Sequence, residues 1–144
     1  MTKTSCIVLK TRSIIIFTKN PELGKAKTRI AATLGDEAAL DIYKQLLDIT
    51  RSVVSNVVST TRLLFYSDQI ITEDAWPNHF FQKHLQSTGD LGDRMEKAFE
   101  TALRLADKAL IIGSDCPYIT KEIIDSAFDA LDTNDVVIGP TFDG

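Results

Sequence analysis

SIIIFTKNPELGKAKTR, residues 13–29, joins an apolar β-branched run to a basic loop, and this stretch decides the fold. Ser13–Phe17 shows no polar alternation, which is typical of a strand buried on both faces of a parallel sheet. Asn20-Pro21 and Gly24 then mark a loop, and the glycine permits close backbone approach. The stretch therefore predicts the opening strand and loop of an α/β domain.

Strand-like and helix-like segments alternate along the rest of the chain, which predicts βαβ units and a mostly parallel sheet. One helix is expected to be capped by Asp36, with Tyr43 on its apolar face. Two others are expected to begin at Gly89-Asp90 and at Thr120. The further predicted strands are Arg62–Tyr66, Phe80–Leu85, Ala109–Ile112 and Val136–Ile138.

Composition is that of an ordinary globular domain, with 144 residues, 44% hydrophobic and 25% charged. The net charge of -4 and the lack of interleaved basic and aromatic residues argue against a nucleic-acid surface. Two cysteines are too few for a disulfide scaffold. No apolar run has the length of a membrane helix and no signal peptide is visible, so we expect no membrane span and a cytoplasmic location.

The loop after the first strand carries Lys19, Lys25, Lys27 and Arg29 against a single acid, Glu22. In open α/β sheets, ligands bind outside the carboxyl ends of the strands. A basic island at that place in an acidic chain suits a phosphate group, which lysine meets with point charge and arginine with a bidentate fork. If the segment is extended, Lys27 and Arg29 share a side. The alternative is a solvated loop whose charges only maintain solubility.

A second candidate, Gly113–Pro117, follows the predicted strand Ala109–Ile112. Magnesium is held by one or two carboxylates plus substrate phosphates, so Asp115 alone is sufficient as a protein ligand. The alternative is an Asp that only shapes the turn. Because Thr120 is already placed to cap the next helix, the pattern favours a metal ligand.

A third candidate, Gln86–Met95, places Gly89, Asp90 and Arg94 at a predicted helix start. A helix start can bind an anion or present backbone amides to a base. An ordinary cap, with Asp90 as the N-cap and Asp93 in the first turn, is the interpretation that these residues alone favour.

Taken together, FTKNPELGKAKTRIAATLG, QSTGDLGDRMEKAF, IIGSDCPYIT and VVIGPTFDG resemble bacterial nucleotide-diphospho-sugar transferase-like proteins. The family includes transferases associated with radical-SAM and selenium genes, and it is similar to 2-phospho-L-lactate guanylyltransferase. The matching segments run from residue 17 to residue 144 in the same order. The resemblance implies a three-layer α/β/α sandwich of the glycosyltransferase-A type, occupied by residues 1–144 as part of a single domain.

The resemblance also implies roles for individual residues. Asp115 is expected to hold Mg²⁺ or Mn²⁺ on the nucleotide diphosphate, and Asp143 matches a further acid assigned here to the metal. Lys27 and Arg29, with Asp115, are expected to act in catalysis. The expected nucleotide-contacting residues are Phe17, Lys19, Gly24, Lys27, Arg29, Gln86, Gly89, Asp90 and Arg94. The metal motif is Ser-Asp-Cys-Pro rather than Asp-x-Asp, so one carboxylate is available at that strand.

These observations predict a metal-dependent transferase with a nucleotide or nucleotide-sugar donor and a small-molecule acceptor, performing glycosyl or nucleotidyl transfer. The alternatives are a non-catalytic nucleotide-binding regulatory module and a receiver-like domain. The latter would need acids at the end of the first strand, where Thr18-Lys19 stands. The chain stops inside a family motif, so it is expected to be a truncated, inactive portion that forms a homodimer through the exposed sheet edge or is poorly soluble.

Overall fold

The isoleucines of the first apolar run form the middle of β1 (Arg12–Thr18), an interior strand of the sheet. Ile14, Ile15 and Ile16 are all 0% exposed in the computed structural model, which describes residues 11–141. Ile14 and Ile16 face one hydrophobic cluster and Ile15 faces another, because successive side chains of a strand point to opposite faces. The prediction of a strand buried on both faces is confirmed.

Four strands form the sheet in the order β3-β2-β1-β4, and every pairing is parallel. Ile15 lies opposite Leu63 on one side and opposite Ile111 on the other, which fixes the register at the centre. The remaining elements, in chain order, are α1 (Thr28–Leu34), α2 (Asp36–Ser55), β2 (Thr60–Tyr66), β3 (Gln82–Leu85), α3 (Leu91–Leu105), β4 (Lys108–Gly113) and α4 (Lys121–Ala130).

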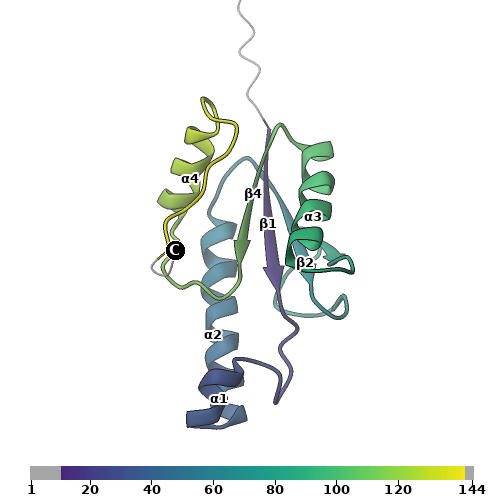
Figure 1. The fold of residues 1–144 in the computed structure, drawn as a ribbon, viewed down its shortest axis with the longest axis vertical. Helices are drawn as coiled ribbons and strands as arrows, with labels where there is room; N and C mark the ends of the chain where they lie inside the picture. The colour runs from purple at the N-terminus through teal and green to yellow at the C-terminus, as the bar shows by residue number, and fades with distance from the viewer. Residues whose placement is uncertain (1–10, 142–144) are drawn as a thin grey trace, which may run out of the picture.

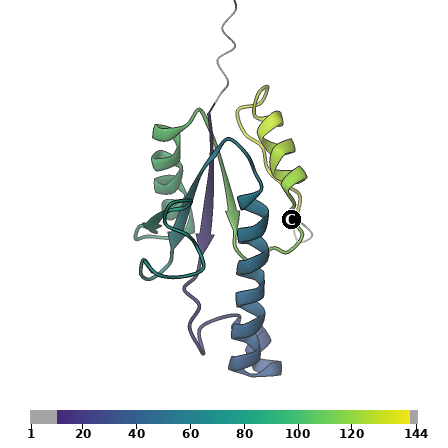
Figure 2. The same cartoon turned by 180° about the vertical axis from the view of Figure 1, so that it is seen from behind.

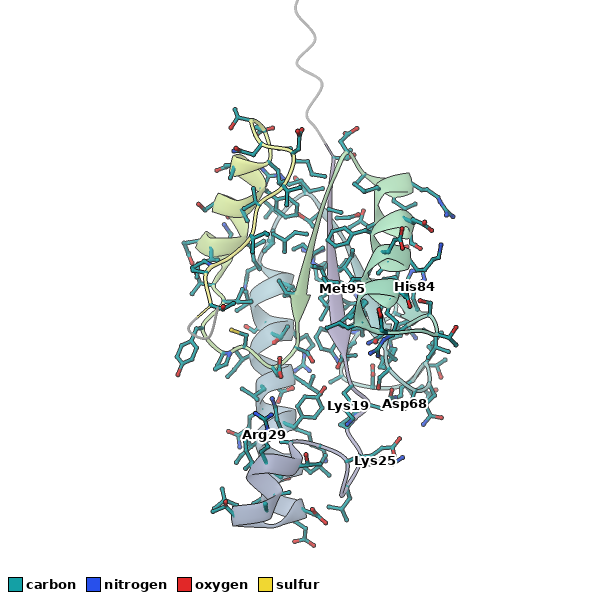
Figure 3. The ribbon with its side chains drawn as sticks, viewed as in Figure 1. Lys19, Lys25, Arg29, Asp68, His84 and Met95 are labelled. Carbon is teal, nitrogen blue, oxygen red and sulfur yellow. The ribbon has the colours of Figure 1, made fainter. Side chains whose placement is uncertain are left out.

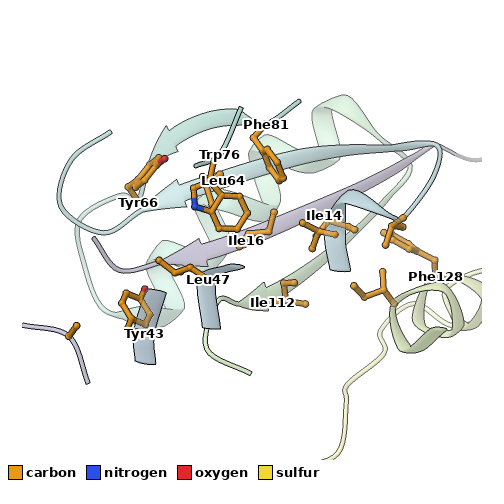
Figure 4. Close-up of a cluster of buried hydrophobic side chains, with 14 residues drawn as sticks. Ile14, Ile16, Tyr43, Leu47, Leu64, Tyr66, Trp76, Phe81, Ile112 and Phe128 are labelled. Atoms are coloured by element: carbon orange, nitrogen blue, oxygen red, sulfur yellow. The ribbon is translucent and has the colours of Figure 1, made fainter. Parts of the chain in front are cut away.

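Helices cover both faces of this sheet, so the predicted three-layer α/β/α arrangement is confirmed (Figures 1 and 2). Helices α2 and α4 pack on one face around a larger cluster that contains Tyr43, Leu64 and Phe128 (Figure 4). Helix α3 packs on the other face through Ala98 and Ala102, which are almost fully buried. No helix within residues 11–141 is long and apolar enough to cross a membrane.

Because all strands are parallel, the loops that follow them leave from the same edge of the sheet. In Figure 1 the arrowheads of β1 and β4 point toward the end of the molecule that carries α1. The basic loop, residues 19–27, follows β1, and the Asp115 loop, residues 114–120, follows β4. The fold therefore brings these two loops to one end of the molecule.

The predicted strand Val136–Ile138 is wrong. Within the described residues this segment pairs with no strand, and Val136 and Ile138 are 72% and 86% exposed. It runs back alongside α4 instead of joining the sheet (Figures 1 and 2). A β-branched run becomes a strand only where a neighbouring edge supplies hydrogen bonds, and here the chain does not lie on one.

Three smaller predictions also need correction. Phe80 and Phe81 precede β3 in a turn, closed by hydrogen bonds from their amides to the Pro77 carbonyl. Asp36 is the first residue of α2 and Gly35 occupies its N-cap. The segment after Lys27 is helical, so Lys27 and Arg29 do not share the side of an extended chain.

Candidate functional site

An ion pair joins the two loops that the sequence singled out most strongly. The Lys27 Nζ lies 2.8 Å from the Asp115 Oδ2, although the residues are 88 positions apart. The Asp115 side chain is 56% exposed and that of Lys27 is 25% exposed, so the carboxylate can accept a further ligand from solvent. This contact shows that the loops after β1 and β4 meet at one edge of the sheet.

Lys27 adopts a backbone conformation that is unusual for a residue with a side chain. Its φ of 47° and ψ of 54° are left-handed, a conformation that costs a non-glycine residue roughly 1–2 kcal/mol. It occupies the N-cap position of α1 without capping that helix through its side chain. Its carbonyl accepts the first helical bonds, from Ile30 and Ala31. The strained turn therefore leaves the ammonium group available for Asp115.

The other cations of the basic loop and of α1 divide into free and paired groups. Lys19 and Arg29 are exposed, and their side chains have no acidic partner among residues 11–141. Lys25 instead pairs with Glu22 at 2.6 Å, and this hydrogen bond raises the pKa of Lys25. Figure 3 shows Lys19, Lys25 and Arg29 at the end of the molecule below the strands. Lys19 and Arg29 are therefore the cations of this segment that carry no acidic partner among residues 11–141.

Of the two residues expected to bind a metal, Asp115 is the one that lies within residues 11–141. No group of three or more His, Cys, Asp or Glu side chains converges within residues 11–141. Asp143, the other residue assigned to a metal, lies outside the described residues. The exposed Asp115 carboxylate fits Mg²⁺ or Mn²⁺ if phosphate and water oxygens complete the coordination.

The Gly-rich loop, residues 86–94, uses its charges internally. Asp90 caps α3 in a reciprocal capping box, in which Asp90 and Asp93 each accept the other's backbone N–H. Gly89 has φ 108°, and a Cβ there would lie 2.4 Å from an Asp93 carboxylate oxygen. Arg94 donates to the Gln86 Oε1 at 3.1 Å. The ordinary cap is what the structure contains.

Gln86 and Phe17 contribute to the sheet near the same edge. The Gln86 Nε2 donates to the carbonyl of Phe65 at 3.1 Å, so this side chain closes the end of β2. The Phe17 ring packs against Phe65, which in turn stacks on His84 at 4.8 Å. Burial lowers the pKa of His84. Both sequence-predicted residues therefore lie where β1 and β2 end, with contacts to the sheet itself.

The sequence analysis missed two buried residues that hold these loops. Asn20 is 1% exposed, donates to the Gln69 carbonyl at 2.9 Å and accepts from the Asp68 amide at 3.0 Å. It thereby ties the loop after β1 to the loop after β2. Tyr43 of α2 binds the backbone of Lys19. In the sequence, the position of Asn20 before Pro21 and the place of Tyr43 on an apolar helix face were the features that could have indicated these roles.

The chain is similar to a solved structure and matches a protein family. A crystal structure described as a "putative nucleotide-diphospho-sugar transferase" from Desulfovibrio desulfuricans G20 matches with a TM-score of 0.79 and 28% identity. The match covers 94% of this chain and 61% of that chain, so the present chain spans less than two thirds of its length. It confirms the resemblance to nucleotide-diphospho-sugar transferase-like proteins. Comparison with curated proteins finds no match.

A family profile matches residues 50–144, which include the Gly-rich loop and the Asp115 loop. That range is well over half of the sequence, and the basic loop precedes it. The chain therefore belongs to the family described as "Uncharacterized protein conserved in bacteria (DUF2064)".

Proposed function

We propose that this chain forms the nucleotide-binding portion of a metal-dependent transferase that uses a nucleotide or nucleotide-sugar donor. The observation that carries the proposal is the Lys27–Asp115 ion pair at 2.8 Å. Lys19 and Arg29, from the same stretch of chain as Lys27, have no acidic partner among residues 11–141. A carboxylate that could hold a metal, in contact with one lysine of a basic segment, suits a diphosphate, since that group needs both a divalent ion and positive side chains. The fold match to a protein described as a "putative nucleotide-diphospho-sugar transferase" supports the same assignment.

The proposed mechanism assigns a separate task to each group. Asp115 would hold Mg²⁺ or Mn²⁺, and a bound ion would supply positive charge to the phosphates of the leaving group. Lys27 and Arg29 stabilise the charge that develops on the diphosphate, and Lys19 attracts the donor. Gly24, at φ 77°, shapes the loop around the phosphates. The same groups serve glycosyl transfer, which releases a nucleoside diphosphate, and nucleotidyl transfer, which releases pyrophosphate.

The Gly-rich loop is proposed to lie near the nucleotide base. Because the Asp90 carboxylate and the Arg94 guanidinium already have protein partners, contacts from this loop would come mainly from its backbone. Phe17 and Gln86 would border the same region from the sheet. We further propose a small-molecule acceptor, a cytoplasmic location, and self-association along the outer edge of β4, which pairs with no strand among residues 11–141.

A non-catalytic nucleotide-binding module is the second candidate. It is favoured by one observation, that Asp115 is the single carboxylate of its loop and no cluster of three possible metal ligands occurs in residues 11–141. Binding without turnover of any donor, in a protein that contains the full length of the domain, would select this candidate.

The direct test is thermal unfolding with a panel of nucleotides and nucleotide sugars, with Mg²⁺, Mn²⁺ or chelator. A binding nucleotide should stabilise the fold by about 2.7 kcal/mol at one hundred times its dissociation constant, and chelator should reduce that gain. If no nucleotide shifts the melting temperature with either metal, the proposal is wrong.

A further inference from the structure

One phenol holds the first residue of the basic loop by both of its backbone groups. The Tyr43 hydroxyl donates to the Lys19 carbonyl at 2.7 Å and accepts from the Lys19 amide at 3.0 Å. Tyr43 is 4% exposed and lies at the end of the larger cluster toward which the arrow of β1 points (Figure 4). The chain therefore leaves β1 in a direction fixed by a side chain of α2.

The same helix also holds the Asp115 loop. The Tyr43 hydroxyl is 3.3 Å from the Ser114 Oγ, which donates to the Thr18 Oγ1 at 3.3 Å. Thr50, seven residues after Tyr43 on the buried face of α2, donates to the Ser114 carbonyl at 3.2 Å. Because seven residues make nearly two helical turns, one rigid element contacts both loops.

Packing alone does not explain these hydroxyl groups. A phenylalanine at position 43 has the same ring, and buried polar groups cost free energy unless they are hydrogen-bonded. The partners of the Tyr43 hydroxyl are confined to Thr18, Lys19 and Ser114 among the described residues. Lys19 is itself a proposed phosphate ligand, and Ser114 directly precedes Asp115.

We propose that Tyr43, assisted by Thr50, is a positioning residue that sets the separation between the basic loop and Asp115. In this proposal the Tyr43 hydroxyl acts on the site through Lys19 and Ser114, which it contacts directly. The identity of what the two loops bind rests on the proposed function, whereas the frame itself rests on the hydrogen bonds. The two claims can therefore fail separately.

The first test uses no ligand and reads the Asp115 loop through Cys116, a partly exposed free thiol next to Asp115. In a Cys6→Ser background, the iodoacetamide labelling rate of Cys116 is compared with and without Tyr43→Phe at several low urea concentrations. For the Asp115 loop, Tyr43→Phe removes the contact between this hydroxyl and the Ser114 Oγ, and one hydrogen bond of about 1 kcal/mol corresponds to an equilibrium factor of about five. We expect a rise of about fivefold that hardly depends on urea, as for a local release of the loop.

Tyr66→Phe is the matched control, because it removes another buried tyrosine hydroxyl, whose partners are Asp74 and the Ile71 carbonyl. The labelling rate of Cys116 in Tyr66→Phe should stay at the parent value, even if this variant loses as much global stability as Tyr43→Phe does. Should Tyr43→Phe not fold, Thr50→Val removes the bond to Ser114 and should act in the same direction. Equal rates in both tyrosine variants, or no rise in Tyr43→Phe and Thr50→Val, would overturn the proposal.

The second test measures the affinity of UDP, GDP and CDP with Mn²⁺ by calorimetry in the same variants. Tyr43→Phe should weaken binding by about fivefold while Tyr66→Phe leaves it unchanged. Equal affinities in Tyr43→Phe and the parent would refute the link to binding. If the parent binds none of them, the proposed function fails in that respect, and the Cys116 rates still decide whether Tyr43 sets the frame.

Discussion

The basic loop and the Gly-rich loop look alike in sequence and differ in structure. Each follows a strand, contains glycine and carries several charges. In the Gly-rich loop, Asp90 and Asp93 cap α3 and Arg94 binds Gln86. After β1, by contrast, Lys19 and Arg29 have no acidic partner within residues 11–141, and Lys27 reaches across to Asp115.

The difference separates two uses of charge at a strand end. A charge that completes a helix cap stabilises the fold and leaves little capacity for a ligand. A cationic side chain that stays in water without a partner carries no desolvation penalty, and it remains available to bind an anion. Mutations in the first kind of loop should therefore change stability, and those in the second should change affinity.

The largest expected effect comes from Asp115→Asn. If Asp115 is the metal ligand, metal-dependent nucleotide affinity should fall roughly 10- to 100-fold, since even outer-shell partners of metals have effects of that size. Stability should change by less than about 0.5 kcal/mol because the side chain is exposed. Calorimetry with Mn²⁺ and urea unfolding measure the two quantities.

Asp90→Asn is the matched control in the Gly-rich loop, since asparagine caps helices about as well as aspartate. It should leave both affinity and stability near the parent values. A loss of several kcal/mol in Asp115→Asn, with an unchanged metal response, would instead identify Asp115 as a structural residue.

The next largest effect is expected in stability, from Gly89→Ala. Its φ of 108° is strained for alanine, and the added Cβ would collide with the Asp93 carboxylate that completes the cap. We expect a loss of about 1–3 kcal/mol in urea unfolding. Gly24→Ala, where the nearest atom is 3.7 Å away, should lose less despite its φ of 77°. Equal losses would mean that backbone strain, not the cap, decides.

Removing single cations should have an intermediate effect on affinity. Arg29→Ala and Lys27→Ala should each weaken nucleotide binding by about tenfold, the value of roughly one charge-assisted hydrogen bond. Lys25→Ala should do so less, because Lys25 is paired with Glu22 within its own loop, whereas the partner of Lys27 is Asp115, itself a proposed part of the site. If all three variants lose the same affinity in calorimetric titrations, the loop acts only through diffuse charge.

The smallest expected effect is a pH dependence from His84. Burial lowers its pKa in the folded state below the ordinary value of about 6.5, so the unfolded chain binds the proton more tightly. The stability contribution is therefore present above about pH 6.5 and is lost as the pH falls toward the folded-state pKa. His84→Phe, which keeps a ring against Phe65, should flatten this slope in urea unfolding, whereas exposed His79→Gln should not.

The sheet was predictable because Ser13–Phe17 and Ala109–Ile112 are apolar runs with no competing interpretation. The cap at Thr120 was equally readable, and its hydroxyl accepts the Ile123 amide. Val136–Ile138 has the same residue types without a neighbouring edge, and the pairing of a strand is a tertiary property that its own sequence does not contain.

The candidate site was predictable only in part. Lys27 and Asp115 follow strands, so parallel topology alone brings them to one edge. The short helix α1 was missed because its first turn starts from the left-handed Lys27, a conformation that sequence does not announce in a lysine. Tyr43 and Thr50 were missed as site residues because a hydroxyl on a helix face reveals nothing of its partners until the loops are placed.

The left-handed turn at Lys27 has a consequence for directed evolution. Glycine would relieve the backbone strain, while the partly exposed ion pair it removes is worth only about 0–1 kcal/mol. A selection for heat resistance alone should therefore recover Lys27→Gly, whereas a selection for nucleotide binding should reject it. Position 27 would then mark where the lineage has kept a less stable residue for the sake of its charge.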